Sequence, residues 1–89
     1  MREVTLLNPF KKDFNLMQKR GKNPKRFEEV LHLLKASLPL PAKYRDHKLT
    51  GDYVGWRDLH IEPDWVLIYK ISGNEIICAA TGTHADLFG

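Results

Sequence analysis

Apolar residues recur through the first half of the chain with the spacing of amphipathic helices. The apolar positions are Phe10, Phe14 and Met17, and then Phe27, Val30, Leu31, Leu34 and Leu38. Each series follows an Asn-Pro pair, at residues 8–9 and 23–24, which is typical of a helix start because Pro suits the first helical turn. Gly21 separates the two series, as expected where a helix ends. The pattern predicts two helices joined by a short connection.

The pattern of a β-sheet fills the rest of the chain. A short strand is expected at residues 2–7, and two longer ones at 65–71 and 75–81. Before them, alternation in the segment that begins near Val54 places Trp56, Asp58 and His60 on one face, and Leu59 and Ile61 on the other. Tight turns at residues 62–64 and 72–74 join these strands, so they should be antiparallel neighbours.

The order strand, helix, helix and three strands predicts an α+β fold, with an antiparallel sheet packed on a helical hairpin. The helices should cover one face of the sheet to bury their apolar stripes, which leaves the other face open for a functional site. Residues 1–89 are expected to form a single domain, because a chain of this length has room for one core. Residues 82–89 are expected to be a short tail.

The composition fits a soluble cytoplasmic protein. Hydrophobic residues make up 43 % of the chain and charged residues 28 %, and no apolar run approaches the roughly 20 residues of a membrane helix. The N-terminus does not read as a signal peptide, because polar residues interrupt its apolar stretch. Cys78 is the one cysteine, so no internal disulfide can form, and its apolar neighbours predict a core position.

The charge is unevenly distributed along the chain. Residues 1–48 contain 12 Lys or Arg and 5 Asp or Glu, a balance of +7, whereas residues 49–89 contain 2 and 6, a balance of −4. A basic first half suggests a polyanionic or acidic partner, although solvated helix faces explain it equally well.

Three histidines and one aspartate outside the predicted helices are candidates for catalysis. They are His47, His60, Asp64 and His84. His60 and Asp64 flank one tight turn and must be close, whereas the position of His84 depends on the order of the strands. Metal-independent RNA cleavage needs a base for the 2′-hydroxyl, an acid for the leaving oxygen and a cation for the phosphate, and histidine suits the first two tasks.

Other readings of these residues remain open. By spacing alone, satisfied turn or surface histidines are the simpler interpretation, and a metal site is disfavoured because the sequence lacks an H-E-x-x-H motif. His32 lies away from the apolar stripe of its helix and is expected at the surface. Aromatic residues near the site, Tyr44, Trp65 and Phe88, could stack on RNA bases, although core packing is the usual role of a tryptophan.

Three sequence blocks resemble one family. Residues 60–70, HIEPDWVLIYK, are similar to the H-x-x-P-D-W/L-x-L-I-Y signature of the YafQ branch of RelE-like toxins. Residues 81–89, TGTHADLFG, resemble the T-G-T/S-H-x-x-L-F terminus of that branch, and residues 38–49, LPLPAKYRDHKL, resemble its L-P-x-x-Y-x-D-H-x-L loop. The blocks occur in the order of the family, and the resemblance covers nearly the whole chain.

The resemblance implies a RelE-like fold and a toxin that cleaves messenger RNA on the ribosome without a cofactor and is neutralised by an antitoxin. It implies a catalytic set of His47, His60, Asp64 and His84. As a working hypothesis, His60 or Asp64 is the base, His84 the acid, and His47 orients or stabilises the phosphate.

The resemblance also implies that Trp65 and Phe88 help to place the substrate. The sequence departs from the family at Ala80, because relatives often have an arginine just before the T-G-T-H run. Basic residues of the preceding loop are candidates to supply the missing cation and to bind RNA: Lys43, Arg45 and Lys48. Arg57 is a weaker candidate, because strand alternation points it away from His60.

Overall fold

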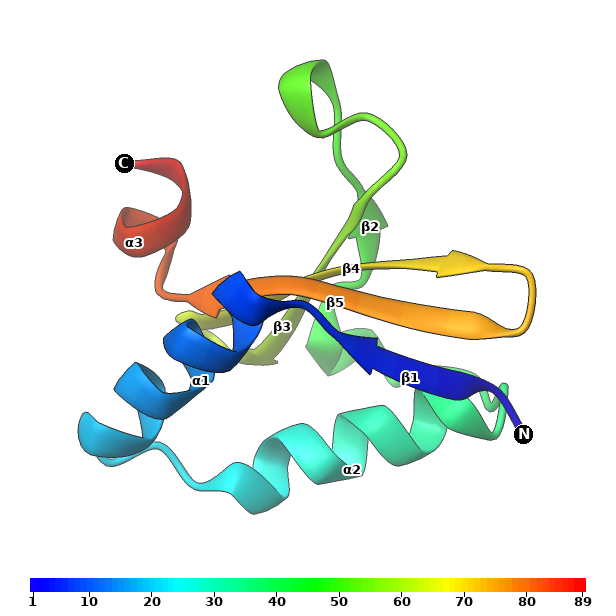
Figure 1. Cartoon of the computed structure of the whole chain (residues 1–89), viewed down its shortest axis with the longest axis horizontal. Coiled ribbons are helices and arrows are strands. Elements are labelled where there is room, and N and C mark those ends of the chain that lie inside the picture. Colours follow the sequence, from blue (N-terminus) through cyan, green and yellow to red (C-terminus); the bar gives the residue numbers. More distant parts are fainter.

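The structure is a computed structural model that describes residues 1–89, and it contains one five-stranded sheet with helices around it (Figure 1). The strands are β1 (Glu3–Leu6), β2 (His47–Lys48), β3 (Arg57–Glu62), β4 (Trp65–Ser72) and β5 (Glu75–Gly82). They lie in the order β1-β5-β4-β3-β2. The predicted α+β class is confirmed. No helix of the structure has the length and apolarity that crossing a membrane requires.

The sheet is mixed, so the prediction of an antiparallel sheet was wrong for one strand. Strands β3, β4 and β5 are joined by tight hairpins and run antiparallel, as expected. In contrast, β1 lies beside β5 and runs parallel to it, with Val4 opposite Ile76. Between β1 and its partner the chain passes through both long helices and the rest of the sheet, and such a long connection permits parallel pairing.

The two long helices agree closely with the sequence pattern. They are α1 (Asn8–Lys19) and α2 (Pro24–Lys35). The side chain of Asn23 caps α2 by accepting a hydrogen bond from the backbone N–H of Lys25 at 3.0 Å. Asn8 does not cap α1, because the helix begins one residue earlier than expected and Leu7 occupies the cap position.

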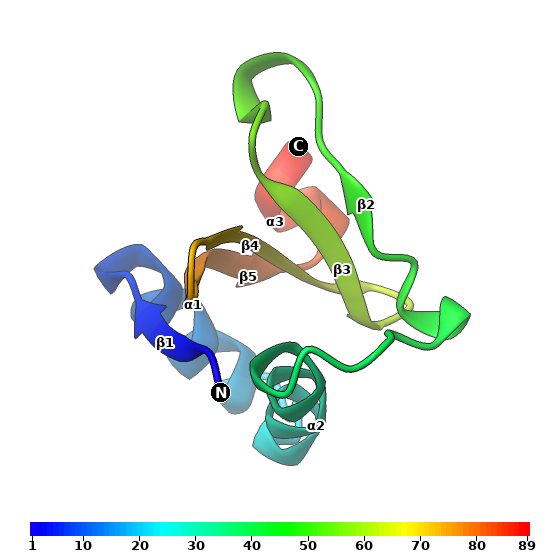
Figure 2. The ribbon, with the colours of Figure 1, turned by 90° about the vertical axis from the view of Figure 1, so that its right-hand side faces the viewer.

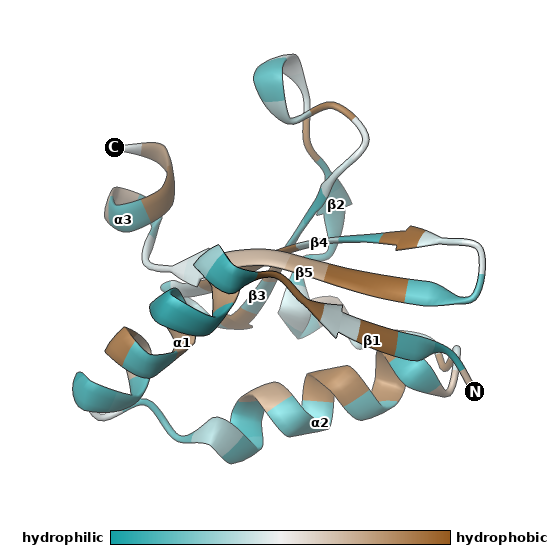
Figure 3. Ribbon diagram, viewed as in Figure 1, coloured by the Kyte–Doolittle hydropathy of each residue, from teal (hydrophilic) through white to brown (hydrophobic).

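Both long helices pack on the same face of the sheet, as predicted, and α3 (His84–Phe88) and the loop at residues 49–56 lie on the opposite side (Figure 2). The core between helices and sheet contains the predicted helix residues Phe10, Phe14, Phe27 and Leu34, and Cys78 is fully buried there. Along α2, apolar and hydrophilic stretches alternate, which is the pattern of a helix with one buried stripe (Figure 3). His32 is exposed on this helix, as expected.

Two of the short elements that the sequence did not predict contain candidate histidines. Strand β2 has two residues and lies in the basic loop, where His47 pairs with Asp58 of β3. Helix α3 replaces the expected tail. Thr83 and Asp86 form its capping box, in which each side chain accepts a hydrogen bond from the backbone N–H of the other residue.

Candidate active site

The three candidate histidines converge on the face of the sheet that the long helices leave open. The ring centroids of His60 and His84 are 5.0 Å apart, and those of His47 and His60 are 6.4 Å apart. His60 lies on β3, His47 lies on the neighbouring edge strand β2, and His84 is the first residue of α3. The sequence left the position of His84 open, and the structure places it beside His60. His60 is therefore the middle member of a row of three imidazoles.

His84 is held by Asp64, which lies in the turn between β3 and β4. Both the ring nitrogen Nδ1 of His84 and its backbone N–H lie close to Oδ1 of Asp64, at 2.8 and 3.0 Å. These hydrogen bonds, first from the backbone and then from the ring, lower the pKa of the Asp64 carboxyl below its ordinary value. The carboxylate is thus occupied in orienting the imidazole, whose Nε2 points away from this contact.

His60 is nearly buried between two hydrogen-bond acceptors. Its side chain is 8 % exposed, its Nδ1 lies 3.2 Å from the carbonyl oxygen of Pro63, and its Nε2 lies 3.4 Å from Oδ1 of Asp58. The Pro63 carbonyl can only accept, so Nδ1 donates to it, whereas Nε2 lies within ion-pair distance of Asp58 without a hydrogen bond between them.

Asp58 is a residue of the site that the sequence analysis did not select. It is 4 % exposed, and its Oδ1 is the one buried side-chain oxygen or nitrogen in the protein without a hydrogen bond. A buried carboxylate without hydrogen bonds is costly, which indicates a role beyond stability. The sequence contained a signal for it, because strand alternation places Asp58 on the same face as His60.

His47 differs from the other two histidines in having no carboxylate within ion-pair distance. Its Nδ1 lies 2.7 Å from the carbonyl oxygen of Arg45, so Nδ1 carries the proton and donates it. The neutral ring then has an unshared electron pair on Nε2. His47 is exposed, so this nitrogen is accessible to a substrate.

Ala80 lies in the same row of the sheet as two residues of the site. The cross-strand partners in this row are His47, Asp58, Ile68 and Ala80, taken from β2 to β5. Because cross-strand partners project from the same face, an arginine at this position would point toward the site. This protein has no cation there.

The two aromatic residues proposed to place substrate are in different environments. Trp65 is fully buried, stacks on Phe14 with ring centroids 6.4 Å apart, and donates its indole N–H to Oγ1 of Thr81 at 2.8 Å. A base cannot reach its ring, so stacking of Trp65 on RNA is excluded and its side chain packs in the core, the usual role of a tryptophan. Trp65 can help to place substrate only indirectly, through the hairpin that presents Asp64. Phe88 is 43 % exposed and lies 6.1 Å from the His84 ring, where a base could stack on it.

The basic residues of the loop are available for contact with RNA. Lys43, Arg45 and Lys48 are exposed, and none of them forms an ion pair. Arg57, in contrast, is bound to Asp46 through an N–O contact of 2.8 Å. It is therefore no replacement for the arginine that position 80 lacks.

Helix α3 is fixed to the end of α1 by one ion pair. Arg20 binds Asp86 with an N–O distance of 2.6 Å, and this contact together with the capping box lowers the pKa of Asp86 to about 2. A lowered pKa means that the carboxylate form of Asp86 is stabilised. The ion pair is therefore intact at any pH well above 2 and weakens as the pH falls toward that value.

Replacing Arg20 with alanine should loosen α3 without unfolding the protein. Asp86 keeps its place in the capping box, so α3 remains helical, but His84 and Phe88 lose their fixed position. We expect the rate of RNA cleavage to fall roughly 2- to 5-fold, since an exposed ion pair contributes little. Lys19→Ala, an exposed change in the same turn of α1, is the matched control. An equal loss of activity in both variants would argue against a role for the ion pair between Arg20 and Asp86.

The His, Cys, Asp and Glu side chains do not form a group of three or more that could hold a metal ion. Polar atoms of His60 and Asp64 already have protein partners. The ring nitrogens of His60 face the Asp58 carboxylate and the Pro63 carbonyl, and the Asp64 carboxylate accepts a hydrogen bond from His84.

Comparison with known proteins agrees with this geometry along the whole chain. Residues 2–89 match the model of a family described as the bacterial toxin of type II toxin-antitoxin system, YafQ. The mRNA interferase toxin YafQ of Escherichia coli strain K12 is 45 % identical over 89 residues, which are 99 % of this chain and 97 % of that protein.

Solved structures of related toxins have the same fold. The toxin chain of the E. coli DinJ-YafQ toxin-antitoxin complex superposes with a TM-score of 0.89 at 45 % identity, covering 99 % of this chain and 98 % of that one. A metal-bound toxin from Helicobacter pylori gives a TM-score of 0.92 at 32 % identity, with coverage of 99 % and 100 %. The protein therefore belongs to the YafQ family of bacterial toxins of type II toxin–antitoxin systems.

Proposed function

We propose that this protein is an endoribonuclease, an mRNA interferase that cleaves messenger RNA on the ribosome and so stops translation. The observation that carries the proposal is the row His47–His60–His84, with centroid separations of 6.4 and 5.0 Å on an open face. The names of its relatives support the same activity. Because its substrate is a message under translation, its place of action is the cytoplasm.

His47 is the general base of the proposed reaction. Its Nδ1–H is bound to the Arg45 carbonyl, so the neutral ring presents the electron pair of Nε2. This nitrogen takes the proton of the 2′-hydroxyl, and the 2′-oxygen then attacks the neighbouring phosphorus. This assignment replaces the earlier choice of His60 or Asp64, since both ring nitrogens of His60 face acceptors and Asp64 is bound to His84.

His84 is the general acid at the other end of the row. The Asp64 carboxylate at Nδ1 stabilises the imidazolium and aims Nε2 away from itself. As the bond from phosphorus to the 5′-oxygen breaks, Nε2 of His84 gives its proton to that oxygen. The products are a 2′,3′-cyclic phosphate and a free 5′-hydroxyl, and the proton taken by His47 balances the one given by His84.

His60 stabilises the negative charge of the phosphate between base and acid. Its Nδ1 faces the Pro63 carbonyl and its Nε2 faces Asp58, so its orientation is set before the substrate binds. We propose that His60, protonated in the reaction, takes over the task that an arginine at position 80 would perform. Asp58 acts through His60 and is a positioning residue rather than a catalytic one.

A cognate antitoxin is the proposed protein partner. The E. coli relative has been solved in a toxin-antitoxin complex with DinJ, at 45 % identity of its toxin chain to this one. The basic first half of this chain, with its balance of +7, would attract an acidic antitoxin segment that becomes ordered on binding.

Primer extension on a translated message tests the proposed function. We expect strong stops, each marking a cut, when the purified protein acts on a message with ribosomes present, and few or none on the same message without ribosomes. Treating the purified protein with EDTA, and removing the chelator by dialysis before ribosomes are added, should leave the cutting unchanged.

Each other outcome identifies a different function. Salt-sensitive RNA binding without any cut would mean a non-catalytic RNA- or ribosome-binding module, which is the second candidate, favoured by the exposed loop cations. Cutting that is abolished by this prior treatment of the protein with EDTA would mean a metal-dependent phosphodiesterase. Equal cutting with and without ribosomes would contradict the ribosome dependence alone.

A further inference from the structure

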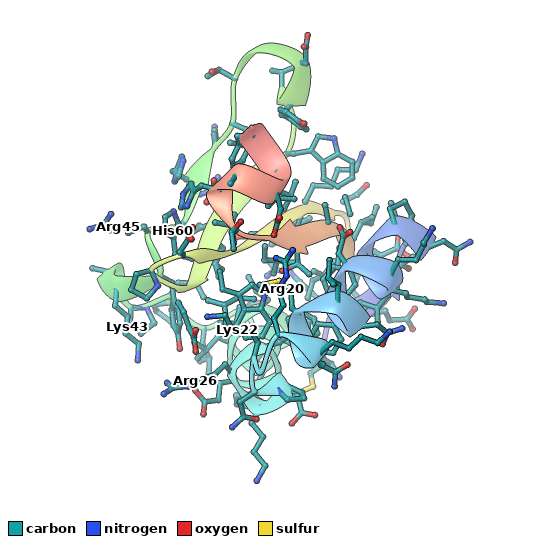
Figure 4. All side chains as sticks on the ribbon, turned by 90° about the vertical axis from the view of Figure 1, so that its left-hand side faces the viewer. Arg20, Lys22, Arg26, Lys43, Arg45 and His60 are labelled. Carbon is teal, nitrogen blue, oxygen red and sulfur yellow. The ribbon has the colours of Figure 1, made fainter.

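A set of basic side chains lies on the same side of the protein as His60 but outside the histidine row. Figure 4 shows them together in one view: Arg20, Lys22, Arg26, Lys43 and Arg45. They come from the end of α1, the connection to α2, the first turn of α2 and the loop before β2. Segments that are distant in the sequence are thus brought to one surface.

Two of these cations are neutralised and three are free. Arg20 is bound to Asp86 and Lys22 to Glu62, at N–O distances of 2.6 and 2.9 Å. Arg26, Lys43 and Arg45 are exposed and form no ion pair within 4 Å. Unpaired exposed cations on one side of a protein favour an anionic partner.

Arg26 and Lys43 stand on the wall of a hollow of about 410 Å³. Its remaining lining residues are Glu29, Tyr44, Ile61, Glu62 and Pro63. Of the two carboxylates, that of Glu62 is already bound to Lys22, so the free charges of the hollow are two cations and Glu29. The balance favours an anion at the rim near Lys43 and Arg26.

The hollow is adjacent to the active site through Pro63. This residue lines the hollow, and its carbonyl oxygen faces Nδ1 of His60 at 3.2 Å. Lys43, which also lines the hollow, is close in the sequence to Arg45 and His47, and Nδ1 of His47 is bound to the Arg45 carbonyl. The same short segment therefore carries two of the free cations and the proposed base.

We infer that Arg26 and Lys43, with Arg45, bind backbone phosphates of the RNA strand being cut, next to the nucleotide whose phosphate lies at the histidine row. This inference rests on the proposed function for the position of the cut. The cut strand is favoured over an acidic protein because Lys43 and Arg45 belong to the same short segment as the proposed base His47, and Pro63 joins the hollow to His60, so phosphates next to the cut would meet this surface.

Binding of an RNA that cannot be cut tests this surface. The probe is a fluorescein-labelled, single-stranded 12-nucleotide RNA with 2′-O-methyl groups, which lacks the attacking hydroxyl, and fluorescence anisotropy is recorded over a series of salt concentrations. The variant Arg26→Gln/Lys43→Gln is compared with Lys11→Gln/Lys12→Gln, which removes the same charge from exposed positions of α1.

We expect Arg26→Gln/Lys43→Gln to bind roughly tenfold more weakly than the wild type at moderate salt. The slope of log K against log salt should become less steep by about 1.4, which is two phosphate contacts on a single strand. The control should keep the wild-type slope. Equal slopes in all three proteins would overturn the inference, and so would a variant that keeps its RNA slope but loses binding to the antitoxin, which would make the surface a protein-docking site.

This test is independent of the proposed chemistry. A protein that cuts no message but shows the expected change of slope would support the proposed RNA-binding surface and contradict the proposed nuclease activity. A protein that cuts translated messages, with Arg26→Gln/Lys43→Gln as active and as tightly bound as the wild type, would sustain the nuclease and disprove the surface.

Discussion

Replacing His84 with alanine is expected to lower the rate of message cleavage by about 10²- to 10⁴-fold, the usual contribution of a general acid. The substitution removes the imidazole that would protonate the leaving 5′-oxygen, and it leaves the Asp64 carboxylate without its ring partner. Expression of the variant should no longer arrest growth. The fold should persist, because the His84 side chain is 48 % exposed and the capping box of α3 is formed by other residues.

The control for this loss is His32→Ala. His32 is exposed on α2, on the side of the molecule away from the site, so its removal deletes an imidazole without touching the proposed chemistry. Both variants should give the wild-type circular dichroism spectrum and bind the antitoxin. Full cleavage by folded His84→Ala, measured by primer extension on ribosomes, would show that another group protonates the leaving oxygen.

The identity of the leaving-group acid can be tested more directly with a modified substrate. A 5′-thio leaving group needs no protonation, because a thiolate is a far better leaving group than an alkoxide. His84→Ala should therefore cut a 5′-thio-substituted message at nearly the wild-type rate. A variant that remains slow on this substrate would place His84 in binding or in activation of the 2′-hydroxyl.

The order of the main elements could be predicted from the sequence, because each carries a local signal. The Asn-Pro starts and the apolar spacing predicted α1 and α2 well, although α2 ends at Lys35 and leaves out Leu38, the last residue of the predicted stripe, and the hairpin turns predicted the antiparallel pairs. Strand β1 has no such signal for its partner. Its parallel pairing with β5 depends on a contact between the two ends of the chain, which no local pattern encodes.

The candidate site was predictable as a set of residues but not as an arrangement. Alternation on β3 and the turn before β4 placed His60 near Asp64, whereas the approach of His84 depends on α3, whose five residues have no amphipathic repeat to reveal them. The sequence left Trp65 between stacking on RNA and packing in the core, because it shows an aromatic residue beside an acid but not the face of the strand on which that residue lies. Asp58 was passed over because an isolated aspartate in a strand resembles any solvated residue until its burial is known.

Asp58 is the second residue for which a large effect is expected. Asp58→Asn keeps the shape of the side chain and puts a neutral amide in place of the carboxylate 3.4 Å from His60, so we expect cleavage to fall about 10- to 100-fold. Stability should behave differently. The wild-type protein buries a carboxylate oxygen with no hydrogen bond, so its neutralisation should not lower the free energy of unfolding by more than about 1 kcal/mol.

A loss of activity without a loss of stability is what separates a positioning role from a structural one. Urea unfolding and cleavage on ribosomes should be measured on Asp58→Asn and on Glu28→Gln, which removes one negative charge from the exposed face of α2. Glu28→Gln should retain wild-type activity. Parallel losses of stability and activity in Asp58→Asn would mean that the carboxylate only supports the fold.

A double variant connects this effect to His60. The Asp58 carboxylate lies 3.4 Å from Nε2 of His60, so its replacement should matter only while the imidazole is present. In a His60→Gln background, Asp58→Asn should therefore have little further effect on the rate of cleavage. Independent, additive losses in the double variant would show that the two residues act separately, and His60 would then not owe its orientation to Asp58.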